Sequence, residues 1–152
     1  MTQTLKQWLK QWEQSPLLND YSYAFKHDIT ITDADKDAAW EMYIELATRI
    51  TTQPLPDNHG EEKAALTSLY SLFGSSREIM KRHGRGCADF TGITLPVINM
   101  QVRPFTAKWH KLSEAGAFDD PEKCQEFRKE LKVLQKELGI YSIMMSGMAM
   151  VK

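Results

Sequence analysis

Apolar side chains recur at helical spacing along most of this chain, and polar or proline-containing stretches interrupt them. Residues that repeat every three or four positions form one face of an amphipathic helix, while proline and glycine mark its ends. We therefore expect helices over 5–12, from a cap at residue 32 or 33 to the break at 53–56, and from about 61 to the glycines at 84 and 86. Trp40 lies in phase with the apolar face of the second helix, so it is predicted to be a core residue.

The segment 89–115 also has an apolar face, on which Trp109 is predicted to reach the core. Pro96 and Pro104 lack the backbone N–H that an α-helix uses, so the segment forms either one kinked helix or two helices joined at a bend. The last helix is expected to start at Asp120-Pro121 and to carry a heptad seam, an apolar stripe with spacings of three and four. The members of the seam are Cys124, Phe127, Leu131, Leu134, Leu138, Tyr141, Met145 and Met148.

Only one segment favours extended structure. Aromatic and β-branched residues partly alternate near residues 21–32, which predicts one or two short strands there. No internal repeat or long linker divides the chain. The pattern thus predicts a single, mostly α domain over residues 1–152, a helical bundle of four to five helices.

Composition adds little to this picture. The chain has 152 residues, of which 42% are apolar and 26% charged, as in ordinary soluble domains. A formal charge of -1 gives no overall attraction to nucleic acid. The two cysteines are too few for a cysteine-based zinc site and indicate a reducing cytoplasm. The N-terminus lacks a secretion signal, and the apolar stretch 140–151 is shorter than the roughly 20 residues of a membrane helix, so we expect no membrane partner.

No metal site or cofactor is expected. Asp33, Asp35 and Asp37 alternate as in a calcium loop, but Ala38 and Ile44 stand where that loop needs Gly and Glu. The three aspartates are interpreted as cap and first-turn acids of a helix. None of the histidines belongs to the Glu-x-x-His pair that carboxylate-bridged metal sites in bundles use.

The most informative polar side chains lie between residues 99 and 110. If the helix continues through Pro104, four of them fall within about 60° of one another and form a polar stripe beside the apolar face. The candidate binding residues are Asn99, Arg103, Thr106, Lys108 and His110. Arg103 and His110 either bridge neighbouring helices or form a pocket for an anion or for the carboxylate of a partner.

An enzymatic alternative uses the same residues. Arg103 and His110 are spaced as Arg-x6-His, and Arg77 and His83 as Arg-x5-His. This spacing resembles the Arg-x4-6-His motif of the helical HEPN ribonucleases, although Pro104 or Glu78 follows the arginine where that family often has a polar residue. The resemblance implies a histidine acid or base and a phosphate-holding arginine at a dimer interface, without a metal. Nucleic acid is a partner only in this alternative.

Three segments, 39–55, 72–79 and 99–110, look like a group of small bacterial helical proteins of unassigned activity. The resemblance covers roughly residues 37–112. It implies a bacterial cytoplasmic origin and an accessory role beside phage-defence genes.

The C-terminal end of the last helix is apolar around most of its circumference. We expect Ile140, Ile143, Met144 and Met148 to lie in an interface with a second chain, unless the helix over 5–12 covers them within one chain. The leading hypothesis is a non-catalytic helical interaction or regulatory module, a homo-oligomer or an accessory subunit. The ribonuclease and a small anionic-ligand sensor are the alternatives.

Overall fold

A computed structural model describes residues 3–12, 30–55 and 61–152. The helices in these parts are α1 (Leu5–Leu9), α3 (Asp33–Ala47), α4 (Glu61–His83), α5 (Ala88–Pro96), α6 (Arg103–Glu114) and α7 (Pro121–Ala149), and shorter helical turns follow several of them. The prediction of a mostly α-helical bundle is confirmed. The strands expected near residues 21–32 lie largely outside the described residues, and within the described part Thr30 forms only an isolated bridge with Thr4.

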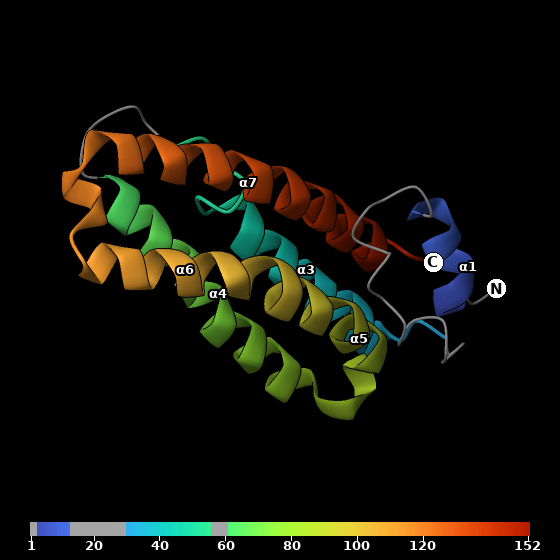
Figure 1. Ribbon diagram of the computed structural model, residues 1–152. Coiled ribbons are helices and arrows are strands. Elements are labelled where there is room, and N and C mark those ends of the chain that lie inside the picture. Colours follow the sequence, from blue (N-terminus) through green and yellow to red (C-terminus); the bar gives the residue numbers. More distant parts are fainter. Residues whose placement is uncertain (1–2, 13–29, 56–60) are drawn as a thin grey trace.

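The bundle is built around α7, which runs along its whole length (Figure 1). Helix α3 packs against α7, α4 packs against α3 and α6, and the rod formed by α5 and α6 lies between α4 and α7. Helix α1 sits at the end of the bundle where α7 ends. Within the described residues no helix has the length and apolar character needed to cross a membrane.

Helix α3 begins with a capping box that also ties it to α5. The Thr32 hydroxyl accepts a hydrogen bond from the backbone N–H of Asp35, whose carboxylate accepts one from the N–H of Thr32 at 2.9 Å. The other oxygen of Asp35 accepts the N–H of Phe90 at 3.0 Å, although Asp35 is only 1% exposed. The acids expected at the start of this helix therefore include one that joins two helices.

The two prolines of segment 89–115 neither separate α5 from α6 nor leave one regular helix. Six residues, Val97–Val102, form a π-helix that joins them, and the N–H of Arg103 bonds to the carbonyl of Ile98, five residues back. Pro104 has no N–H with which to form the α-helical bond four residues back, so the wider turn lets the chain pass it.

The core confirms one tryptophan prediction and contradicts the other. Trp109 is fully buried, whereas Trp40 is 44% exposed and packs on Tyr43 with ring centroids 5.5 Å apart. The buried side of α3 is lined instead by smaller and more flexible side chains, namely Ala38, Ala39, Met42 and Leu46. Because α3 lies close to α7, its inner face needs small residues, and the large aromatics turn outward.

The apolar end of α7 is covered largely within the same chain. Met144 and Met148 are 0% exposed within this one chain, so neither side chain offers surface to a second chain here, and self-association stays a prediction. Trp8 of α1 and Trp12 just after this helix lie against this end, because a β-carbon added at Gly147 would be 3.6 Å from the Trp12 ring and 3.9 Å from the Trp8 ring. Ile140 is half-buried, and Ile143 remains 60% exposed.

Candidate functional site

Arg103 lies at the junction of the π-helix and α6 and points toward α4. Its guanidinium lies over the Phe73 ring of α4, 4.5 Å from the ring centroid. Its Nε and Nη2 donate hydrogen bonds of 3.2 and 3.1 Å to Oδ1 of Asn99. The aromatic face and the amide together hold the guanidinium in one orientation and leave the donors on Nη1 unused within the described residues.

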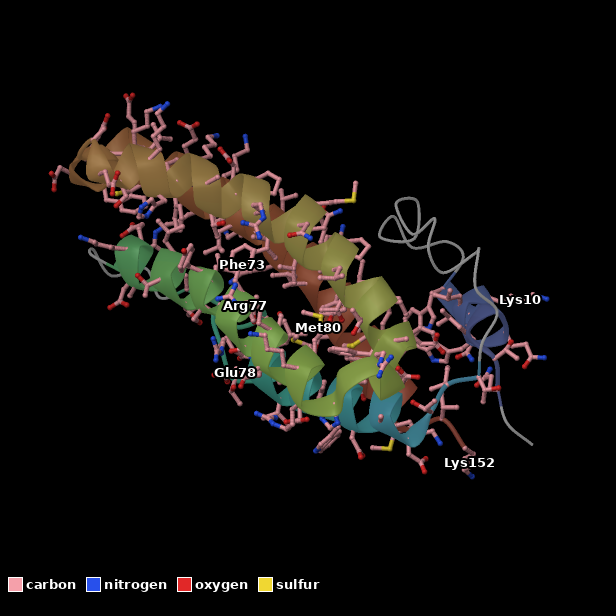
Figure 2. The ribbon with its side chains drawn as sticks, turned by 90° about the horizontal axis from the view of Figure 1, so that it is seen from below. Lys10, Phe73, Arg77, Glu78, Met80 and Lys152 are labelled. Atoms are coloured by element: carbon pink, nitrogen blue, oxygen red, sulfur yellow. The ribbon has the colours of Figure 1, made fainter. Side chains whose placement is uncertain are left out.

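Arg77 of α4 lines the same cavity as Arg103, and Figure 2 shows Arg77 and Phe73 on this helix. The cavity measures about 350 Å³, and its other walls are Tyr70, Ser71, Phe73 and Gly74. In the described parts of the chain no carboxylate pairs with Arg77 or Arg103. This cavity, which we call the arginine cavity, therefore carries two positive charges and no negative charge among its lining residues.

Ser71 contributes little to binding in the arginine cavity. Its hydroxyl donates to the carbonyl of Ser68 at 2.6 Å and accepts from Nη1 of Arg49, which also pairs with Glu45. The hydroxyl is thus already used on both sides. Among the lining side chains, the two arginines supply the charged donors.

His110 and Thr106 lie farther along α6, at a second cavity of about 390 Å³. The His110 side chain is 67% exposed, its Nε2 lies 3.3 Å from Oε1 of Glu114, and its ring stacks on Tyr70 with centroids 6.5 Å apart. Thr106 is 3% exposed and donates to the carbonyl of Arg103 at 3.2 Å. Tyr70, which is 63% exposed, lines both cavities and makes them neighbouring parts of one groove between α4 and α6.

Lys108 does not belong to this groove. Its Nζ lies 2.6 Å from Oε2 of Glu130 and 3.6 Å from Oε1 of Glu126, both on α7. The hydrogen bond to Glu130 raises the pKa of Lys108, and Trp109 donates to the same carboxylate at 3.2 Å. Among the sequence candidates, Arg103, Thr106 and His110 line the groove beside α4, and Asn99 bonds to Arg103. Lys108 instead joins α6 to α7.

Neither arginine–histidine pair converges on a point where one phosphate could sit. Arg103 bonds to Asn99, one turn toward the N-terminus, whereas His110 bonds to Glu114, one turn toward the C-terminus. Seven residues also separate the two α-carbons by about 10 Å along a helix. His83 is held by Glu41, while Arg77 lines the arginine cavity. Within one chain, this arrangement lacks the paired acid–base and phosphate contacts of the ribonuclease motif.

Other reactive groups do not form a site in the described residues. No group of three or more His, Cys, Asp or Glu there is placed to hold a metal ion. Burial raises the pKa of the thiols of Cys87 and Cys124, so both are protonated and poorly nucleophilic at neutral pH.

Sequence reasoning connected Arg77 with the ribonuclease spacing but did not place it in a cavity with Arg103. A helical signal was present, because Tyr70, Phe73, Gly74 and Arg77 follow one another at intervals of three, one and three and so share one face of α4. What the sequence lacked was the pairing of this face with Arg103.

No family model, curated protein or solved structure matches this chain, so its function has to be inferred from its own geometry.

Proposed function

We propose that the protein is a non-catalytic helical interaction module that binds an acidic partner through the groove between α4 and α6. The observation that carries this proposal is the arginine cavity, in which Arg77 and Arg103 meet without a described carboxylate. Both arginines are solvent-exposed, so their donors are open to a partner, and two positive charges beside one cavity attract an acidic group. Arginine and tyrosine are also the residue types that contribute most often to binding energy at protein interfaces.

The exposure of Tyr70 supports contact with a partner at the same place. Its ring is 63% exposed between the two cavities and touches Phe73 on one side and His110 on the other. A large aromatic side chain held in this way offers contact area with little loss of conformational freedom on binding. A homo-oligomer, an accessory subunit and a bacterial cytoplasmic setting beside phage-defence genes stay predictions.

A photo-crosslinking amino acid at position 70 tests the proposal in the cells that make the protein. We expect one discrete adduct from position 70, and its mass will distinguish a second copy of this chain from another protein. Position 133 on α7 is the matched control, because Val133 is 61% exposed and lies outside the groove. Equal adducts at both positions, or none at position 70, would contradict a specific partner at this groove.

The non-catalytic part of the proposal has its own test. Purified protein is incubated with labelled RNA in EDTA, and no cleavage above background is expected. Cleavage that disappears in His110→Ala would show instead that the alternative with Arg103 and His110 is correct. Light scattering coupled to size exclusion would then report whether a dimer brings the two side chains together.

A further inference from the structure

We infer that the arginine cavity is a binding site for a phosphate monoester, an assignment that rests on the proposed function and names the acidic group. The two arginines come from different helices, α4 and α6, and face one cavity of about 350 Å³. A guanidinium presents parallel N–H donors that match the oxygens of a carboxylate or a phosphate. Two such groups match a dianion, and a phosphate monoester carries a charge of about -1.5 to -2 at neutral pH.

Arg103 is already arranged for such a ligand. The Phe73 ring covers one face of its guanidinium, and Asn99 accepts from Nε and Nη2. The Nη1 group therefore remains to donate, and the side chain loses little freedom when an anion binds. This arrangement differs from a surface ion pair, in which two long side chains must be ordered for one contact.

Arg77 and Gly74 complete the cavity on α4. A β-carbon added at Gly74 would lie 3.9 Å from Nη2 of Arg77, so the guanidinium extends beside a helix position that has no side chain. The absent side chain leaves room for oxygens next to the Arg77 donors. No described residue hydrogen bonds to Arg77, whose side chain is solvent-exposed and can offer its donors to a ligand.

The charge, the fork geometry and the room at Gly74 together favour phosphate over a single carboxylate. A carboxylate neutralises one guanidinium, whereas a phosphate dianion has enough charge and oxygens for both. The neighbouring Tyr70 ring at the mouth provides an apolar surface for the group to which the phosphate is attached.

Calorimetric titration at low ionic strength tests this inference with phenyl phosphate and benzoate, which share a ring and differ in the anion. We expect phenyl phosphate to bind about tenfold or more tightly than benzoate, and the binding to weaken as salt is added. Inorganic phosphate forms a third arm. Equal binding of inorganic phosphate would identify the free ion as the ligand, and weaker binding would identify an ester. Equal binding of benzoate, or no binding of phenyl phosphate, would overturn the inference.

Variants assign the binding to this cavity. Arg77→Met and Arg103→Met should each weaken phenyl phosphate binding by about tenfold or more, and Arg103→Lys should restore only part of it because lysine lacks the fork. Arg85→Met is the matched control, since Arg85 lines a different cavity. Gly74→Leu fills the arginine cavity without changing its charge, and leucine favours the helix over glycine, so binding should fall while the melting temperature is kept. Unchanged binding in Gly74→Leu would place the ligand elsewhere.

The outcomes for the two proposals can be told apart. A crosslink from position 70 that persists in Arg77→Met and Arg103→Met would support a partner at the groove and contradict the phosphate site. Phosphate binding that depends on both arginines, without any crosslink, would keep the phosphate site and reject the protein partner. That second result is the one expected of a small anionic-ligand sensor.

Discussion

A buried hydrogen bond between Thr94 of α5 and Tyr141 of α7 joins the two helices, and its contribution can be isolated by a double-mutant cycle. The hydroxyls of Thr94 and Tyr141 lie 2.6 Å apart, and both residues are 0% exposed. Removing one partner of such a bond leaves the other group without water or a partner, which costs about 1–3 kcal/mol. Removing both partners is far less costly, because no polar group remains unsatisfied.

The two single variants should differ in magnitude. In Tyr141→Phe the Thr94 hydroxyl can turn to the carbonyl one turn back in its own helix, so we expect a loss of about 1–1.5 kcal/mol. Thr94→Val leaves the Tyr141 hydroxyl buried without that local alternative, and we expect a loss of about 2–3 kcal/mol. The double variant should lose at least about 1 kcal/mol less than the sum of the two.

Urea unfolding followed by far-ultraviolet circular dichroism measures these free energies, provided that the slope against urea stays constant across the four proteins. Additivity within about 0.5 kcal/mol would refute the coupling. Burial also raises the pKa of Tyr141 above its ordinary value. The stability that the buried neutral Tyr141 hydroxyl contributes is therefore fully present below about pH 10, the unfolded pKa, and is lost as the pH rises further. As the pH rises above about 10, Tyr141→Phe should therefore lose less stability than the wild-type protein loses.

Three further changes test packing, charge and backbone. Glu62 is 3% exposed, and although burial tends to raise its pKa, hydrogen bonds from the backbone and Arg128 hold that pKa below its ordinary value. The stability that the ionised Glu62 contributes is present above about pH 4.3, the unfolded pKa, and is lost as the pH falls through the folded pKa. Glu62→Gln should therefore lower the free energy of unfolding by about 3 kcal/mol at pH 7 and by less in acid. Urea unfolding of both proteins between pH 7 and pH 3 checks this, and a difference in the free energy of unfolding that does not change with pH would contradict it. Gly139→Ala should stabilise the protein by about 0.5–1 kcal/mol, because nothing lies within 4 Å of the added carbon, whereas Gly116→Ala should destabilise it by about 1–2 kcal/mol, because φ is 86° there. Equal melting temperatures for these two variants would be inconsistent with that difference. Met148→Glu should unfold the chain, since it places a charge at a 0% exposed position, and a folded monomer released from a dimer would contradict this expectation.

Helix boundaries were largely readable from local residue types. Thr32 caps α3, Asp120 caps α7, and Gly116 ends α6 with a left-handed backbone. These signals act within four residues and so do not depend on the rest of the fold. The heptad seam of α7 was also predicted from the sequence, because its repeat continues long enough to define one buried face.

The phase of α3 depended on tertiary structure. Its sequence offers two faces, one with Trp40 and Ile44 and one with Ala39 and Met42, and hydrophobicity favours the first. The structure buries the second, because close packing against α7 leaves no room for the larger rings. The π-helix before Arg103 was likewise not predicted beyond a bend, since the wider turn results from proline together with packing on both sides.

The candidate site shows the same division between local and tertiary information. The sequence alone determined that Arg103 lies on a polar stripe, because the 3.6-residue repeat places side chains around a helix. It also determined that Tyr70, Phe73 and Arg77 share one face of α4. Only the tertiary structure decided that these two faces meet and that Lys108 turns to α7 instead. The physical reason is that helical periodicity fixes angles within one helix, whereas the packing of the whole core selects which faces of different helices come together.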